Sequence, residues 1–168
     1  MNKETEQVVY DFIDSLGIEH TTFHHDEAST MDVCEVIEQQ LGVPICKNLF
    51  LTNRQQTQFY LLMMPGDKPF KTKYISSQLG CARLSFADEG QMENLLHIKP
   101  GSVSIMGLVF DEENKVRLVI DKDLLQFSHL GCHPCLNTAT MKIAVTDLLG
   151  KFLPAVHHDY TVVELPRE

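Results

Sequence analysis

The chain has 168 residues, of which 43% are hydrophobic and 22% charged, a composition typical of an ordinary globular domain. Its formal net charge is −9, and residues 1–40 carry the whole excess of acidic side chains. The sequence contains no apolar run of the roughly 18 residues that a membrane-spanning helix needs, and no signal-peptide pattern at its N-terminus. Five cysteines without an export signal favour reduced thiols, so we expect a cytoplasmic protein with no membrane partner.

Two helices and a short strand are expected in the first part of the chain. Apolar residues recur at helical spacing over residues 8–16, and Gly17 follows as a stop signal. A second helical pattern covers residues 33–41 and ends at Gly42. A strand over residues 20–25 separates the two helices.

The middle of the chain has the pattern of a β-hairpin followed by two helices. Two apolar stretches, residues 48–52 and 58–63, flank a polar turn and predict paired strands. Helical patterns follow over residues 72–79 and 88–96, and Asp88 is a suitable N-cap for the second helix.

The last third of the chain predicts more strands and one more helix. Residues 106–110 and 116–120 flank an acidic turn and indicate a second hairpin. The remaining expected elements are a strand over residues 138–143, a helix over residues 146–152 that ends before Pro154, and a strand over residues 160–165.

The order of these elements sets the expected fold class. Helices and strands are interspersed without strict β–α–β alternation, and no internal repeat or linker interrupts them. We therefore predict an α/β fold: a single compact domain over residues 1–168, with a mixed, largely antiparallel sheet flanked by helices. A domain of this length can bury a sizeable core without disulfides or metals.

A basic stretch stands out in a chain that is acidic overall. Between residues 66 and 86 the only acidic residue is Asp67. Such a local excess of cations can meet a phosphate backbone, although a solvated loop and helix face explains it equally well. The cations in this stretch are Lys68, Lys71, Lys73 and Arg83.

The tetrapeptide from Cys132 to Cys135 allows three interpretations. A CxxC pair can form a dithiol redox centre, but thioredoxin-like chains place it after the first strand, at the start of a long helix. The two sulfurs and His133 could also bind zinc, although a closed zinc site needs four ligands and the other cysteines are isolated. We favour the third interpretation, a loop whose cysteines are small apolar residues.

Two further features are ambiguous when each is considered alone. Lys47 precedes an apolar strand, so its ammonium must snorkel outward or find a negative partner. The glycine-bearing stretch from Lys99 to Ser104 either exposes successive main-chain N–H groups to an anionic group or forms an ordinary turn. A G-x-S-x-G nucleophile elbow and a Walker loop are both missing from the sequence, so neither of those classes is supported.

Three motifs occur in a characteristic order along the chain. They are C-K-N-L-F-L over residues 46–51, G-S-V-S over residues 101–104, and His133-Pro134 followed by Asn137-Thr138. In this order and at these separations they resemble the YbaK-like family of aminoacyl-tRNA deacylases, which is related to the editing insertion of bacterial prolyl-tRNA synthetases. The similarity covers nearly the whole chain and is greatest to the free-standing branch that removes alanine from proline tRNA.

The resemblance implies a compact α/β fold that hydrolyses the ester between an amino acid and the terminal adenosine of tRNA. It places the family's lysine on Lys47, which would engage the 3′ end of the tRNA. The adjacent asparagine falls on Asn48, which would help to position the aminoacyl group.

The same resemblance implies the other side of the site. The glycine loop falls on Gly101 to Ile105, and its residues Ser102, Val103 and Ser104 would present main-chain groups to the substrate carbonyl and amine. His133 would shape the pocket for alanine. Phe50, Ile105 and Asn137 complete the expected substrate-binding set.

A positioned water is the expected nucleophile, with the substrate's own ribose hydroxyl as a proton relay and with no metal or cofactor. The implied partner is the acceptor end of an aminoacyl-tRNA, with Ala-tRNA(Pro) as the first candidate and prolyl-tRNA synthetase as a second partner. The sequence does not set the oligomeric state, and a monomer is the working expectation.

One residue departs from the family pattern and keeps alternatives open. Ile105 stands where the loop of the family has proline, so the backbone of this loop is less restricted. This departure supports a second hypothesis, a tRNA- or synthetase-binding module that has kept the fold and lost the chemistry. A dithiol oxidoreductase that uses Cys132 and Cys135 is the third hypothesis.

Overall fold

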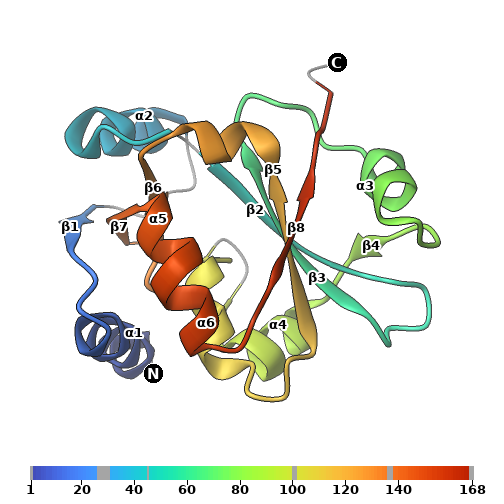
Figure 1. Cartoon of the computed structure of the whole chain (residues 1–168), viewed down its shortest axis with the longest axis horizontal. Coiled ribbons are helices and arrows are strands. Elements are labelled where there is room, and N and C mark those ends of the chain that lie inside the picture. The colour runs from blue at the N-terminus through green and yellow to red at the C-terminus, as the bar shows by residue number, and fades with distance from the viewer. Residues whose placement is uncertain (1, 26–30, 45, 100–101, 136–137, 167–168) are drawn as a thin grey trace.

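Two β-sheets form the framework of the computed structural model, rather than the single sheet expected from the sequence (Figure 1). The structure describes residues 2–25, 31–44, 46–99, 102–135 and 138–166. The larger sheet has the strand order β4-β2-β3-β5-β8: β2 (Cys46–Thr52), β3 (Phe59–Pro65), β4 (Ser85–Phe86), β5 (Val116–Asp121) and β8 (Tyr160–Val163). The smaller sheet has the order β1-β7-β6: β1 (His20–His24), β6 (His129–Cys132) and β7 (Ala139–Ala144).

The pairing of the strands confirms the mixed, largely antiparallel character expected of this α/β fold. Strands β2 and β3 form the predicted hairpin, in which Lys47 lies opposite Met64. The smaller sheet is antiparallel throughout, and β4 is antiparallel to β2. Only β5 introduces parallel pairing, because β3 and β8 both run parallel to it.

Four helices lie where the apolar periodicity predicts them. Asp88 caps α4 as expected, since its side chain accepts a hydrogen bond from Gln91 N and the Gln91 side chain accepts one from Asp88 N. In Figure 1, α1 and α2 flank the smaller sheet, and α3 lies at the far side of the larger one. The helices are α1 (Asn2–Ser15), α2 (Met31–Leu41), α3 (Thr72–Leu79) and α4 (Glu89–Leu96).

The strand predicted over residues 106–110 is wrong, because this segment forms a 3₁₀ helix, η1 (Ile105–Phe110). The Ser104 hydroxyl accepts a hydrogen bond from Met106 N at 3.1 Å and so caps the first turn. A Cβ on Gly107 would lie 2.9 Å from Leu96 Cβ and 2.7 Å from Ile98 Cδ1, so only glycine lets the turn approach the end of α4 this closely. The apolar residues of this segment correctly indicate that it is buried, but they do not distinguish a strand from a helical turn.

The helix expected to end before Pro154 instead continues through it. The segments α5 (Val145–Asp147), η3 (Leu148–Phe152) and α6 (Leu153–Ala155) follow one another without a break, and η3 is a π turn. The wider turn shifts the hydrogen-bond pattern, so Pro154 lies where a new α segment begins and its missing N–H is tolerated.

The sequence does not predict three short elements, because they carry no local signal. They are β4, β6 and η2 (Lys122–Gln126).

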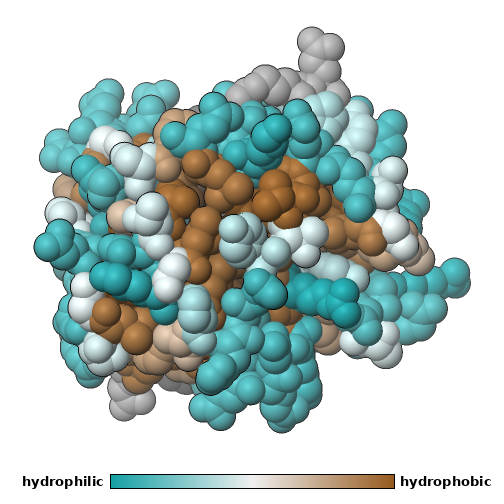
Figure 2. All heavy atoms as spheres, viewed as in Figure 1, coloured by the Kyte–Doolittle hydropathy of each residue, from teal (hydrophilic) through white to brown (hydrophobic). Residues whose placement is uncertain are grey.

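Apolar side chains form separate clusters on the two faces of the larger sheet. Cys46 and Phe50 of β2 belong to the cluster that also includes residues of the smaller sheet. Leu49 and Leu51 belong to the cluster on the opposite face, beside α3 and β8. On the face shown in Figure 2, hydrophobic atoms reach the surface between β8 and the α5–α6 segment, within a hydrophilic rim. No helix in the described part of the chain is long and apolar enough to cross a membrane.

A buried ion pair ties the start of β5 to the segment before β8. Asp111 Oδ2 lies 2.8 Å from His158 Nε2, and both side chains are almost fully buried. Burial alone raises the pKa of Asp111, but hydrogen bonds from His158 and from the N–H groups of Val116 and Lys115 hold it below its ordinary value. The ionised carboxylate is therefore the form that stabilises the fold.

This pair predicts a contribution to stability that is lost in acid. The carboxyl has a pKa of about 3.9 in an unfolded chain, so the contribution is complete above about pH 4 and disappears as the pH falls through the lower folded pKa. We expect Asp111→Asn to lower the free energy of unfolding at pH 7 by roughly 3 kcal/mol and to make its decline below pH 4 shallower. Urea unfolding at a series of pH values measures both effects, and an unchanged acid slope would contradict the assignment.

Candidate functional site

Lys47 and Asn48 lie side by side at the start of β2 but point to opposite faces of the sheet. Side chains alternate along a strand, so Asn48 shares its face with Cys46 and Phe50, and Lys47 shares the other face with Leu49. Both Lys47 and Asn48 are partly exposed. The two neighbouring motif residues therefore lie on different sides of one strand.

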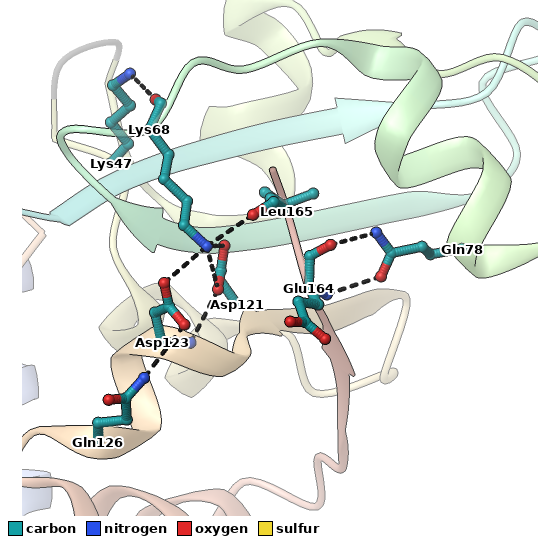
Figure 3. A network of polar contacts seen from close by, with 8 residues as sticks. All are labelled: Lys47, Lys68, Gln78, Asp121, Asp123, Gln126, Glu164 and Leu165. Carbon is teal, nitrogen blue, oxygen red and sulfur yellow. Dashed lines mark hydrogen bonds and ion pairs between the residues drawn. The ribbon is translucent and has the colours of Figure 1, made fainter. Parts of the chain in front are cut away.

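The Lys47 ammonium is held by a main-chain carbonyl. Its Nζ donates a hydrogen bond of 2.6 Å to Lys68 O, as Figure 3 shows. A lysine ammonium has three donors, and this carbonyl uses one of them. Lys47 thus has a fixed acceptor together with a partly exposed position, which suits it to hold an anionic group.

Lys68 does not belong to the RNA-facing set in which the sequence placed it. Its side chain is 2% exposed, and its Nζ lies 2.9 Å from both Asp121 Oδ2 and Asp123 Oδ2. Burial alone lowers the pKa of Lys68, but hydrogen bonds and charge from the two aspartates outweigh it and raise the pKa above its ordinary value. The ammonium is charged and already neutralised inside the protein, so it is not available to a phosphate.

The other three cations of the basic stretch are exposed, as a role at the surface requires. Lys71 and Lys73 both lie close to one aromatic ring, with Nζ atoms 5.9 and 5.3 Å from the Tyr74 ring centroid. Arg83 follows α3 and is also exposed. Phe86, at the edge of the larger sheet, is 59% exposed and contacts Phe70 with ring centroids 5.6 Å apart.

The described part of the glycine loop is buried and is tied to the His133 segment. Ser102, Val103, Ser104 and Ile105 are all buried, whereas Gly101 lies outside the described residues. The Ser104 hydroxyl donates to His133 O at 2.6 Å and also caps η1, so it links two segments 29 residues apart. Val103 and Ile105 join the same apolar cluster as Phe50. The structure thus brings the glycine loop and the His133 segment into contact, and Phe50 of the first motif belongs to the same core cluster as the loop.

His133 is held as a neutral imidazole. Its Nδ1 lies 2.9 Å from Ala139 O, and a carbonyl can only accept, so Nδ1 carries the hydrogen. Burial, with a smaller contribution from the charge of His25, lowers the pKa of His133 below its ordinary value despite the bond to Ala139. At neutral pH, Nε2 is therefore an acceptor. Asn137, the other candidate in this segment, lies outside the described residues.

The CxxC cysteines do not have the environment of a reactive dithiol. Cys132 and Cys135 are both buried and unpaired, and burial raises the pKa of both thiols, to about 12 for Cys135. A reactive cysteine needs a lowered pKa and access to solvent. Among the described residues, no group of three or more His, Cys, Asp or Glu side chains is arranged to hold a metal ion. These observations favour the structural interpretation of the two sulfurs.

The buried cysteines give a direct test of the dithiol hypothesis. Because the thiolate is the reacting form, we expect iodoacetamide at pH 8 to leave Cys132 and Cys135 unmodified in the folded protein and to modify them after unfolding in urea. Peptide mass spectrometry measures both states. Partly exposed Cys81 serves as the internal control for reagent activity. Rapid alkylation of Cys132 in the folded state would contradict the assignment.

The sequence gives no sign of the contacts that the predicted site residues make with distant parts of the chain. The partners of Lys68 lie 53 and 97 residues away along the chain, at Asp121 and Leu165. His25, whose ring centroid is 6.3 Å from that of His133, is not among the predicted site residues. No local pattern marks such contacts, and only the order of the strands in the two sheets brings them together.

A comparison with known protein families agrees with this arrangement. The model of the aminoacyl-tRNA editing domain matches residues 25–151, a range that contains Lys47, the glycine loop and His133. The chain belongs to this family. The resemblance found in the motifs is thereby confirmed, and membership of the editing family supports the deacylase interpretation.

Similar proteins extend the comparison to nearly the whole chain. The prolyl-tRNA editing protein ProX of Acetoanaerobium sticklandii is 32% identical over 165 residues, covering 98% of this chain and 100% of ProX. The prolyl-tRNA synthetase associated domain-containing protein 1 of Danio rerio is 32% identical over 160 residues, covering 94% of this chain and 84% of the relative. A crystal structure described as a candidate trans-editing enzyme for prolyl-tRNA synthetase has a TM-score of 0.71 at 16% identity, covering 96% and 98% of the two chains, and shares the fold.

Proposed function

We propose that this member of the editing family is a trans-acting aminoacyl-tRNA hydrolase whose substrate is Ala-tRNA(Pro). The observation that carries the proposal is Lys47, a partly exposed ammonium held on β2 next to Asn48 within the matched family domain. The names of the relatives, which refer to prolyl-tRNA editing and to prolyl-tRNA synthetase, support proline tRNA as the nucleic acid partner. Cytoplasmic translation is the setting that such a substrate implies.

The reaction we propose is attack of water on the aminoacyl ester. Water adds to the carbonyl carbon, the bond to the ribose oxygen breaks, and the products are free alanine and tRNA with its hydroxyl restored. Lys47 would hold the 3′-terminal phosphate, and main-chain N–H groups of residues 103–105 would stabilise the developing oxyanion, since Ser102 N already donates to Lys99 O. His133 Nε2, unprotonated at neutral pH, would accept a hydrogen bond from the water or the amino group.

The apolar surroundings of the site suit a small amino acid. A synthetase pocket built for proline cannot strongly reject alanine, because each methylene is worth only about 1–3 kcal/mol. Val103, Ile105 and Phe50 are buried apolar residues of one cluster, and Ser104 bonds the same loop to the His133 segment, so a small apolar side chain is the kind of group that these surroundings favour. A second site that admits alanine and excludes proline would therefore correct the error.

Lys47 is the residue whose replacement tests the proposal most directly. We expect Lys47→Ala to lower kcat/KM for deacylation of Ala-tRNA(Pro) by about 10- to 100-fold, because a hydrogen bond to a charged group is worth about 1.5–3 kcal/mol. Release of labelled alanine measures the rate. Lys115→Ala removes an exposed lysine at the turn before β5 and should leave the rate unchanged. Equal rates for Lys47→Ala and the unchanged protein would refute the role of Lys47.

The exposed cations beyond Lys68 form the RNA-facing surface of the proposal. Lys71 and Lys73 lie at the start of α3, which follows the loop that contains the carbonyl partner of Lys47. Arg83 and the exposed Phe86 lie just beyond this helix. Cations beside an exposed aromatic ring are the groups that a single-stranded RNA end can contact through phosphates and stacked bases.

Salt dependence distinguishes phosphate contacts from a merely solvated surface. Each phosphate contact adds about 0.7–0.9 to the slope of log affinity against log salt concentration. We expect Lys71→Ala with Lys73→Ala to reduce that slope by about 1.5 in tRNA-binding titrations. The control is the double variant Lys115→Ala with Lys151→Ala, which removes two positive charges from other exposed positions and should leave the slope unchanged. Identical slopes for both double variants would exclude this surface.

A second function is favoured by one observation, the isoleucine at position 105. A non-catalytic module that binds tRNA or prolyl-tRNA synthetase would keep the fold without the loop geometry that proline provides. A panel of mischarged tRNAs separates the two functions. Binding of tRNA without deacylation of any aminoacyl-tRNA in the panel would favour the binding module.

A further inference from the structure

Lys68 lies at the centre of a buried polar network, which Figure 3 shows. Its Nζ lies 3.1 and 2.9 Å from the two Asp121 carboxylate oxygens and 2.8 Å from Leu165 O, in addition to its ion pair with Asp123. Asp121 is fully buried, and Lys68 is 2% exposed. Buried charges persist only when they are paired and hydrogen-bonded, so this side chain is fixed from three directions.

The main chain of the same residue faces Lys47. Lys68 O accepts the hydrogen bond from Lys47 Nζ, and Lys68 N donates to Pro65 O at 3.3 Å across the turn after β3. Pro65 is paired with Cys46, the residue before Lys47, in the β2–β3 hairpin. The carbonyl that holds Lys47 therefore belongs to a residue fixed both to the hairpin and to the interior.

The network also fixes the segment that follows β8. The Gln78 side chain donates to Glu164 O at 2.6 Å and accepts from Glu164 N at 2.7 Å, directly beside Leu165. The Asp121 carboxylate accepts in addition from Asp123 N, which caps η2. The Lys68 loop, residues 121–123 and the segment after β8 thus meet at one ammonium, and α3 is bonded to the last of these segments through Gln78.

We propose that Lys68 is a positioning residue for deacylation, which holds the Lys47 ammonium in place through its own main-chain carbonyl. The proposal rests on the role of Lys47 in the proposed function. A lysine side chain has many rotamers, and ordering it costs conformational entropy. Because Lys68 O already holds the Lys47 side chain, less entropy is lost when Lys47 binds and positions the substrate. Loss of the Lys68 ammonium would release the turn, and Lys47 would no longer be held where the tRNA end lies.

A double-mutant cycle between the two lysines tests this proposal. We expect Lys68→Met to lower kcat/KM for Ala-tRNA(Pro) by about tenfold in the otherwise unchanged protein, and to have no further effect in the Lys47→Met background. Lys68→Arg, which keeps a cation between the aspartates, should restore most of the rate. If Lys68→Met slows both backgrounds by the same factor, the network only stabilises the fold and the positioning role is refuted.

Two further variants guard against loss of folding. Lys68→Met leaves two carboxylates without their cation, whereas Lys68→Met with Asp121→Asn keeps the net charge of the cluster and should show the same coupling to Lys47. Asp111→Asn breaks a different buried ion pair and is the matched control. It should lower stability and show no coupling, and coupling of equal size would refute a specific role for Lys68.

The outcomes separate this proposal from the proposed function. An unchanged protein that deacylates no aminoacyl-tRNA refutes the function itself. In another outcome the unchanged protein is active and Lys47→Met slows it, but Lys68→Met slows both backgrounds by the same factor. That result supports the proposed function and refutes only the positioning role of Lys68.

Discussion

Neutralisation of one buried ammonium constrains much of this molecule. Because the Lys68 side chain is inside, two carboxylates and a carbonyl have to converge on it, and they come from the end of β5, from η2 and from the segment after β8. The parallel β3–β5 and β5–β8 pairs place the ends of these strands at one edge of the sheet. The same residue offers its main-chain carbonyl to Lys47. The need to neutralise the buried Lys68 ammonium is thereby connected to the position of Lys47, which is partly exposed.

The alternation of side chains on β2 divides the candidate site into two parts. Lys47 belongs to the face of the larger sheet that carries α3 and the exposed cations, which is the side proposed to meet RNA. Asn48 belongs to the face that packs toward the smaller sheet, where Phe50, Val103 and Ile105 line the apolar side. A substrate with a nucleic acid end and an amino acid end fits such a division, since one strand can contact both ends at once.

The sequence predicts what depends on neighbours in the chain and misses what depends on distant partners. Helical periodicity located α1 to α4, and Asp88 was recognised as a cap, because each signal lies within a few residues. Lys68 was assigned to the surface because a lysine between Asp67 and Pro69 has no local sign of burial, and its carboxylate partners are 53 and more residues away. The segment from Ile105 became a 3₁₀ helix because Gly107 allows a close approach to Ile98, a contact that apolar patterning does not contain.

The isoleucine at position 105 can be understood in the same physical terms. Proline would fix φ at this position through its ring, and isoleucine leaves that angle to be fixed by contacts. Ser104 supplies them, because its hydroxyl donates to His133 O and accepts from Met106 N. The burial of Ile105, at 1% exposure, adds packing on the other side. The loop is therefore held between a hydrogen-bonded serine and a buried isoleucine, and its position is coupled to His133, the residue proposed to contact the amino acid.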